Sequence, residues 1–354
     1  MDRIEIIRFD RGGLRAWEPA WRSLEQRAPD AAPFVCFDWL AAWADVYAPA
    51  RLAVVRVGDG AEPLALGLVE VARGGRWRFA GRPVAGERGL LAEAAARDRA
   101  WRALGAWLET NPRRWATLET AGLPAAAASA LPAGPRGATE VPMLTIPDSF
   151  EGYLAERPGR TRTRYRRALR RVAEEGAVLG PVADGEVGPA LHDFVVLHGL
   201  RAASKGERHA AVDGRLERVL AALDGAPSVR LRVLELAHGG RRVGATVRLE
   251  RPGGTWFYNS GFDPEAAWLA PGIMLALASI RDAIDHGISR IDLGAGAQTY
   301  KLVLGGVVEE RFDVLAASRS PRGRLLGAAE AAYREARARV PVRTLARRLL
   351  GRGS

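Results

Sequence analysis

The order of apolar and polar positions divides the first part of the chain into amphipathic helices and short strands. Apolar side chains recur at helical spacing over residues 14–24, and Phe37–Trp43 begins a second helix for which Asp38 is the predicted N-cap. The turn at residues 58–60 joins two strands into a hairpin. We predict strands at 4–9, 52–57, 64–71, 76–79, 115–120 and 141–146, and further helices at 92–109 and 125–131.

The second part of the chain repeats this order of elements. Helices come first, then an antiparallel meander, a helix and further strands, although no residue-level repeat accompanies the order. The prediction is an α+β fold with two similar halves, 1–147 and 148–318, whose sheets are mixed and mainly antiparallel, and a basic helical tail, 319–354. The predicted helices are 150–157, 161–175, 188–202, 213–222 and 272–286, and the strands are 229–237, 243–250, 255–262, 290–293 and 308–316.

The composition is that of a folded chain without a membrane span. Hydrophobic residues make up 48% and charged residues 26% of 354 residues, which is typical of globular proteins and leaves room for two domains. The start of the chain lacks the basic-then-apolar order of a signal peptide. The longest nearly uncharged apolar helical stretch, 269–280, is too short to cross a bilayer. We therefore expect a cytoplasmic protein.

Much of the positive charge lies in two runs of arginine. The formal net charge is +11, and the runs are 157–171 and 319–352, so nucleic-acid binding over the whole surface is not indicated. The single cysteine, Cys36, excludes an intramolecular disulfide and a multi-cysteine zinc site. The five histidines never occur at metal-ligand spacing, so we expect no metal.

Candidate chemistry gathers between residues 255 and 301. An aromatic and β-branched strand, 255–262, leads through a short loop to Pro271-Gly272, where a helix with one apolar face begins. Glycine has no side chain to cover the unpaired N–H groups of a helix start, and such a start attracts phosphate. The alternative is that Pro-Gly merely begins a helix. The strand Ile291–Leu293 follows, and then Gly294-Ala295-Gly296 and Tyr300-Lys301.

This order of parts resembles the acyl-CoA cradle of the GNAT superfamily of acyltransferases. The run Leu269-Ala270-Pro271-Gly272-Ile273-Met274 keeps the central glycine of the family's Arg/Gln-x-x-Gly-x-Gly/Ala loop and departs from the pattern at both ends. Together with Asp292–Gly296 and Tyr300-Lys301, it is similar to two branches with tandem GNAT-like halves. One is the CelD-like acetyltransferases of exopolysaccharide and cell-envelope biosynthesis, and the other is the Fem-type aminoacyltransferases of peptidoglycan bridges.

The resemblance implies a donor site and a set of catalytic residues in the second half. Acetyl-CoA or another acyl-CoA would be the donor. The resemblance gives Lys301 the role of stabilising the oxyanion. From its place in a short apolar strand, Asp292 could orient or deprotonate the attacking amine, and Tyr258 and Tyr300 could donate to the leaving thiolate or to the substrate. The alternatives are a solvated lysine, a carboxylate capping the glycine loop and core aromatics. The residues implied for the donor are Phe262, Pro271, Gly272, Ile273 and Met274.

Acceptor binding is expected between the halves. Trp39 and Trp43 fit the CelD-like pattern, and Arg164 and Arg167 could neutralise phosphates of a nucleotide-activated or lipid-linked acceptor. The basic run could equally be a solvated helix face. The basic tail could lie on anionic lipid at the inner membrane face or pack on the protein.

Taken together, the sequence predicts an enzyme that moves an acyl group, such as acetyl, from acyl-CoA to an amine of a sugar or a cell-envelope precursor. One alternative keeps the fold and takes aminoacyl-tRNA as the donor, which is the one case in which nucleic acid would be a partner. A second alternative is a non-catalytic scaffold on the membrane surface.

Overall fold

The computed structural model describes residues 2–132, 136–183, 185–206 and 213–339. In the first half, four antiparallel strands are followed by a parallel one: β1 (Ile4–Phe9), β2 (Leu52–Val57), β3 (Ala65–Ala72), β4 (Arg76–Phe79) and β6 (Thr117–Leu123), with the two-residue β5 (Leu91–Ala92) on β3. The helices are η1 (Arg11–Trp17), α1 (Glu18–Arg27), η2 (Pro33–Val35), α2 (Phe37–Tyr47), α3 (Ala94–Thr110) and α4 (Ala125–Ala130).

The second half has the same plan. β7 (Arg136–Thr145) is the last strand before the boundary predicted at residue 147. The strands of the second half are β8 (Val178–Pro181), β9 (Arg230–His238), β10 (Arg241–Arg251), β11 (Gly254–Phe262), β12 (Arg290–Asp292) and β13 (Val307–Ala317). Its helices are α5 (Phe150–Ala155), α6 (Gly159–Glu174), α7 (Val187–Ser204), α8 (Gly214–Ala221), η3 (Pro264–Leu269), α9 (Pro271–Asp285) and α10 (Thr299–Val303), and α11 (Pro321–Arg339) follows. The predicted elements are therefore confirmed, with shifts of a few residues at their ends.

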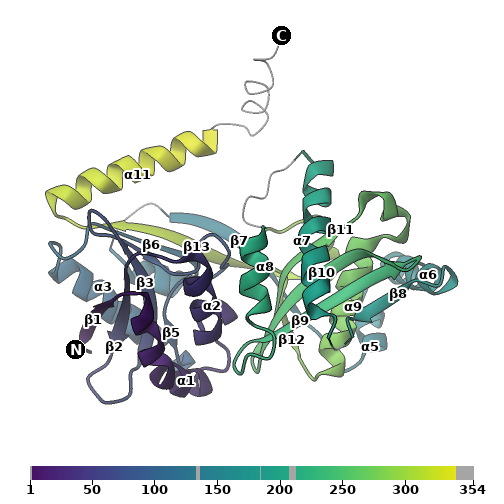
Figure 1. Ribbon diagram of the computed structural model, residues 1–354, viewed down its shortest axis with the longest axis horizontal. Helices are drawn as coiled ribbons and strands as arrows, with labels where there is room; N and C mark the ends of the chain where they lie inside the picture. Colours follow the sequence, from purple (N-terminus) through teal and green to yellow (C-terminus); the bar gives the residue numbers. More distant parts are fainter. Residues whose placement is uncertain (1, 133–135, 184, 207–212, 340–354) are drawn as a thin grey trace, which may run out of the picture.

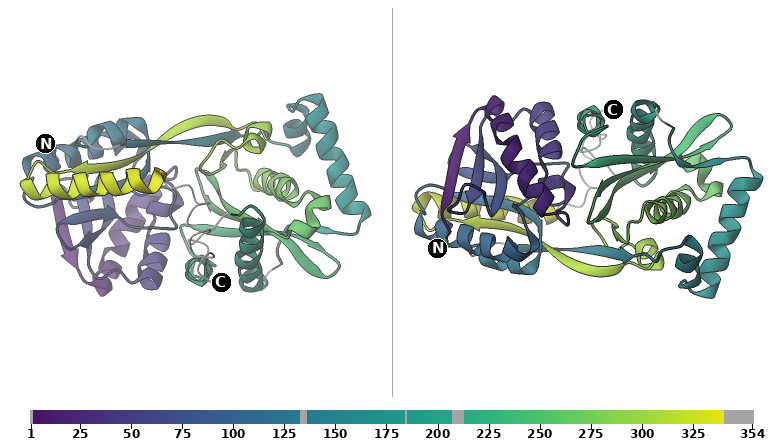
Figure 2. Two further views of the ribbon diagram at one scale, coloured as in Figure 1. Left: turned by 90° about the horizontal axis from the view of Figure 1, so that it is seen from above. Right: turned by 90° about the horizontal axis from the view of Figure 1, so that it is seen from below.

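All strands join into one continuous sheet that runs through both halves (Figure 1). The order is β1-β2-β3-β4-β6-β13-β7-β12-β11-β10-β9-β8. β13, from the end of the chain, pairs with β6 of the first half and with β7. β7, in turn, pairs with β12 of the second half. Figure 2 shows β7 and β13 running side by side from one half to the other. The pairing thus crosses the boundary predicted at residue 147.

Three apolar cores hold this arrangement. One lies under α3, which connects the parallel strands β4 and β6, and one lies under α9, which connects the parallel strands β11 and β12. The third core is shared, because α1 and α2 of the first half bury their apolar faces against α7, α8, β9 and β10 of the second. Burial of this shared face contributes to stability only when the halves are in contact.

Polar contacts fix the joint between the halves. The carboxylate of Asp38 accepts hydrogen bonds from the backbone amides of Ser228 (2.8 Å) and Val229 (3.2 Å), and it also pairs with Arg22. The prediction of Asp38 as an N-cap is wrong, because the cap position is Cys36 and Asp38 lies in the first turn, facing the other half. Arg251 donates to the carbonyl oxygen of Ala28 at 2.9 Å.

The C-terminal tail packs on the first half. α11 contacts β13 and β6, and Gly323 and Gly327 lie so close to them that a Cβ atom at either position would be within 2.6 Å of Ser318 or Ala317 atoms. The predicted tail beyond residue 339 lies outside the described residues. Across the described ranges, no helix is both long and apolar enough to span a membrane.

Replacing Asp38 with alanine should destabilise the protein. The change leaves two part-buried amides of the other half without an acceptor and removes one of the carboxylates that pair with Arg22, so the free energy of unfolding should fall by roughly 2–4 kcal/mol. Asp45→Ala, in the same helix, removes an exposed pair with Arg15 and should cost less than about 0.5 kcal/mol. Urea titrations of both variants measure the difference. Equal midpoints would contradict the role of Asp38 in the joint.

Candidate functional site

The candidate site begins where two parallel strands separate. β11 and β12 pair only at Thr255 with Ile291 and at Trp256 with Asp292. β12 then ends, whereas β11 continues to Phe262 along β10. The side of β11 that faces away from β10 is therefore without a strand partner from Phe257 onward in the described part of the chain. Such an open strand edge can bind an extended ligand through its backbone.

A cavity of about 580 Å³ adjoins this gap and lies between the two halves. Its wall in the second half is formed by Phe257–Asn259 together with Asp292, Gly294 and Ala295. The first half contributes apolar side chains such as Phe34 and Val84 and the charged pair of neighbours Glu87 and Arg88. The volume is that of a small-molecule site.

Asp292 stands where the strand gap meets the cavity. One carboxylate oxygen accepts a hydrogen bond from the amide of Gly294 at 2.7 Å, which confirms the capping interpretation of this residue. Burial raises the pKa of Asp292 above its ordinary value, while the positive charges of Arg311 and Lys301 oppose that rise. A carboxylate with a raised pKa at a cavity wall can accept a proton from a bound amine.

Lys301 is buried below the loop that follows β12. Its side chain is 5% exposed, and Nζ donates to the carbonyl oxygens of Gly294 (2.9 Å) and Ala295 (2.8 Å). Desolvation lowers its pKa to about 8, although the carboxylate of Asp292 acts in the opposite direction. The alternative of a solvated surface lysine is wrong. The ammonium holds the two loop residues that border the cavity.

The two tyrosines lie in different environments. Tyr258 is half-buried, its hydroxyl donates to the carbonyl of Val84 in the first half at 2.8 Å, and desolvation raises its pKa. Its hydroxyl therefore joins the halves, and in this arrangement it is not directed at a leaving group. Tyr300, next to Lys301 in α10, is 39% exposed. The sequence suggested proton donation for both tyrosines, but the structure places them in different environments.

The residues expected to hold the donor surround the start of α9. Ala270 is left-handed (φ 53°), and its carbonyl accepts from the amides of Ile273 (3.1 Å) and Met274 (3.0 Å). Proline has no N–H, so the amide of Gly272 is the one in this turn that has no acceptor among the described residues. The expected cluster of unpaired amides is therefore smaller than predicted. Met274 and Pro271 are themselves buried.

Phe262 lies close to the helix start. Its ring is 3.5 Å from the position that a Cβ atom of Gly272 would occupy, so a side chain there would lie against the ring. The ring also contacts an arginine, because the guanidinium of Arg201 lies 5.1 Å from the ring centroid. Arg201 also donates to the carbonyl of Ser260 at 3.0 Å, which places a positive charge beside the open part of β11.

The predicted acceptor residues do not line the cavity. Trp39 and Trp43 are 0% and 2% exposed in the shared core, where Trp39 packs behind Phe34 and Tyr258 with ring-centroid distances of 4.9 and 5.6 Å. They support the wall instead of contacting a ligand there. Arg164 and Arg167 are exposed on α6, at the far end of the second half (Figure 1). The structure therefore contradicts their grouping with Trp39 and Trp43 in one acceptor site.

Sequence reasoning missed the charged residues that the first half contributes. Burial raises the pKa of Glu87 to about 6, and Arg311 and Arg97 oppose this shift. Arg88 is the neighbouring cavity residue and pairs with Glu119 at 3.1 Å. Glu87 and Arg88 lie in an irregular segment between two glycines, where neither periodicity nor a motif marks them. Within the described ranges, no group of three or more His, Cys, Asp or Glu side chains is placed to hold a metal ion.

Comparison with known proteins finds a family model that matches part of the second half, and solved structures that are similar in fold over most of the chain. Residues 159–302 match the family described as acetyltransferase (GNAT) domain. FemX is similar in structure over 91% of this chain and 100% of its own, with a TM-score of 0.61 and 12% identity. No curated protein matches the sequence.

Two further solved structures are similar. The C-terminal domain of a putative lysylphosphatidylglycerol synthetase from Agrobacterium fabrum has a TM-score of 0.57 at 11% identity, covering 89% of this chain and 96% of its own. L-PGS from Bacillus licheniformis has a TM-score of 0.52 at 11% identity, covering 88% and 96%. At these identities the likeness concerns the fold. The predicted α+β fold with GNAT-like halves is confirmed.

The depressed pKa of Lys301 can be measured directly because the chain contains two lysines, Lys205 and Lys301. Labelling with ¹³C at lysine Cε should give two NMR signals, and the exposed Lys205 serves as the internal reference. The Lys301 signal should titrate near pH 8. In Asp292→Asn the midpoint should fall further, because an attractive negative charge is lost. A midpoint above 10 would contradict the buried placement.

Proposed function

We propose that this protein is an N-acyltransferase that moves an acyl group, such as acetyl, from acyl-CoA to an amine of a sugar or another cell-envelope or exopolysaccharide precursor. The match of residues 159–302 to the GNAT acetyltransferase domain family supports the proposal. The observation that carries the proposal is the position of Asp292, at the point where the gap between β11 and β12 meets the cavity between the halves. The donor occupies the gap and the acceptor occupies the cavity.

The donor is held by backbone groups. The pantetheine arm lies along the open side of β11 from Phe257 to Phe262 and places the thioester beside Asp292. The pyrophosphate lies at the start of α9, where Gly272 offers an amide and the helix dipole favours negative charge. Pro271, Ile273 and Met274 shape this turn. Arg201, beside Phe262, adds a positive charge at the same end.

The reaction needs one proton acceptor and one proton donor. The amine nitrogen attacks the thioester carbonyl, the C–S bond breaks, and the proton of the amine passes to Asp292 while the thiolate is protonated. The exposed Tyr300 is the proposed donor of that proton. Lys301 is a positioning residue, because its ammonium fixes the carbonyls of Gly294 and Ala295 and so aims their amides and Asp292 at the reacting atoms.

The cavity favours a polar acceptor. Glu87 and Asp292 offer negative charge for an ammonium group, and Arg88 and Arg311 offer positive charge for a carboxylate or phosphate of the same molecule. Phe34 and Phe257 give an apolar surface between these groups. An amino sugar or amino acid derivative with an anionic group matches this distribution. We place the reaction in the cytoplasm, where acyl-CoA is available.

A second donor, aminoacyl-tRNA, is favoured by one contact. Arg171 of the arginine-rich helix α6 donates to the carbonyl of Trp268 at 3.1 Å, which brings that helix beside η3 and the start of α9. Arg164 and Arg167 on its exposed face could then contact a nucleic-acid backbone. Calorimetric titration with acetyl-CoA and with charged tRNA separates the donors, because only the true donor should bind in the micromolar range.

Asp292→Asn should lower kcat by 10²- to 10⁴-fold, because an amide cannot accept the proton of the amine. Activity of the unmodified enzyme should rise as the pH rises through the raised pKa of Asp292, since the base is the carboxylate form. The variant should lose this acid limb. Asp285→Asn, an exposed change at the other end of α9, is the matched control and should leave kcat unchanged. Full activity of Asp292→Asn with acyl-CoA would refute the proposed base.

A further inference from the structure

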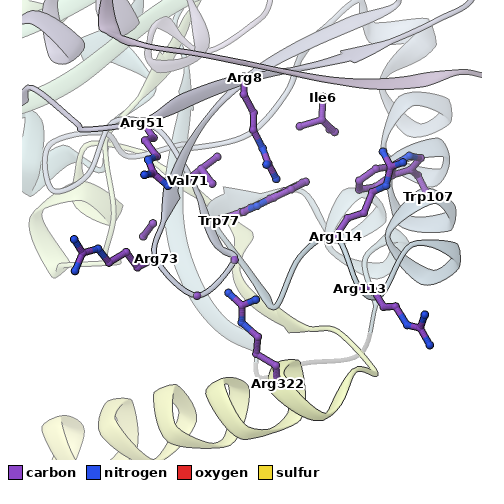
Figure 3. A pocket seen from close by; sticks show the side chains of 13 residues that line it. Ile6, Arg8, Arg51, Val71, Arg73, Trp77, Trp107, Arg113, Arg114 and Arg322 are labelled. Carbon is purple, nitrogen blue, oxygen red and sulfur yellow. The ribbon is translucent and has the colours of Figure 1, made fainter.

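A second pocket, of about 640 Å³, lies on the first half and shares no lining residue with the cavity between the halves (Figure 3). It is formed by residues near the ends of β1 and β3, the turn between β3 and β4, the end of α3 with the residues after it, and the start of α11. The proposed reaction makes no use of it. Six of its thirteen lining residues are arginines: Arg8, Arg51, Arg73, Arg113, Arg114 and Arg322.

These six arginines have no counter-charge. No acidic side chain lines the pocket, and none of the six guanidinium groups has a hydrogen-bonded or ionic partner among the described residues. Many other arginines of the first half are paired, such as Arg22 with Asp38, Arg27 with Glu93 and Arg99 with Asp2. The pocket instead brings six unpaired cations together around one space, and their mutual repulsion favours binding of a multivalent anion.

The arginines come from separate segments; the side chains of Arg8, Arg51, Arg114 and Arg322 point toward one space, whereas those of Arg73 and Arg113 extend away from it (Figure 3). Arg8 is in β1, Arg51 precedes β2, Arg73 is in the turn after β3, and Arg322 is in the first turn of α11. In Figure 3 the side chains of Arg8, Arg51, Arg114 and Arg322 surround the ring of Trp77. Guanidinium groups bind phosphate through paired N–H donors, so convergence from several sides suits a ligand with more than one phosphate group.

Two indole rings give the pocket an aromatic wall. Trp77 and Trp107 are stacked with ring centroids 5.9 Å apart and an interplanar angle of 24°. Trp77 is 1% exposed, and its indole N–H is buried without an acceptor in the described part of the chain. Trp107 is half-buried and lies at the open side, beside Arg114 in Figure 3. Its ring can stack on a flat ring of a ligand.

We propose that this pocket binds a small compound with two or more linked phosphate groups and a flat ring, the chemical class of the nucleoside diphosphates. The volume lies within the range of small-molecule sites. The phosphates are bound by the arginines of the strand edge and of α11, and the base stacks on Trp107. The site is separate from the donor gap, so it serves a second ligand. It does not depend on the proposed acyl transfer.

The test is calorimetric titration of the full chain with UDP, ADP, inorganic pyrophosphate and inorganic phosphate at low salt. We expect binding of both nucleotides and of pyrophosphate, and much weaker binding of phosphate. Arg51→Gln/Arg114→Gln should weaken nucleotide binding at least tenfold. The control Arg102→Gln/Arg218→Gln removes the same charge from exposed sites on α3 and α8 and should change the affinity less than twofold.

Two further variants make the outcome specific. Trp107→Ala should weaken UDP severalfold and leave pyrophosphate unchanged, and Asp292→Asn should bind UDP like the unmodified protein. The proposal is overturned if no probe binds at millimolar concentration, or if both double variants weaken binding equally. It is also overturned if tRNA binds through Arg51 and Arg114 while the nucleotides do not, because the ligand would then be a nucleic acid.

Discussion

Backbone pairing of β13 with β6 on one side and β7 on the other is the constraint on which the structure depends. A strand that belongs to two ladders cannot slide or rotate against one half without breaking hydrogen bonds to the other. The shared core and the contacts of Asp38 and Arg251 act on the same joint. Because the halves are fixed, the cavity between them has a defined shape, and Asp292 has a fixed position relative to Glu87 and Arg88.

Desolvation is the main cause of the pKa shifts of both ionisable groups in the proposed centre, Asp292 and Lys301. It raises the pKa of Asp292 and lowers that of Lys301, while the attraction between their charges works against both shifts. Both side chains bind the same short loop. Asp292 accepts a hydrogen bond from the amide of Gly294, and Lys301 donates one to the carbonyl oxygen of Gly294. Gly294 has a positive φ of 76°, so the tight turn that permits both contacts favours glycine.

Periodicity and turn chemistry were sufficient to predict most helices and strands and their tandem order, because these depend on local sequence, but they did not predict the short strands β5 and β8 or the short helix α10. The pairing of strands could not be predicted in this way. Nothing within residues 136–145 indicates that β7 lies between β12 and β13. The same limit applied to single residues. Asp38 is placed in the sequence as an N-cap would be, but its carboxylate accepts a hydrogen bond from the amide of Ser228, which is 190 positions away. Lys301 and Asp292 were identified by motif, whereas the six pocket arginines share no local pattern.

In the proposed reaction, the donor lies along the open side of β11 and reaches the start of α9. Hydrogen–deuterium exchange with and without a thioether analogue of acyl-CoA, which cannot transfer its acyl group, tests it most directly. Exchange should slow at residues 257–262 and at Gly272, with little change at β1 or α11. Binding of the analogue that leaves exchange at those positions unchanged, and slows it in another part of the chain, would contradict the account.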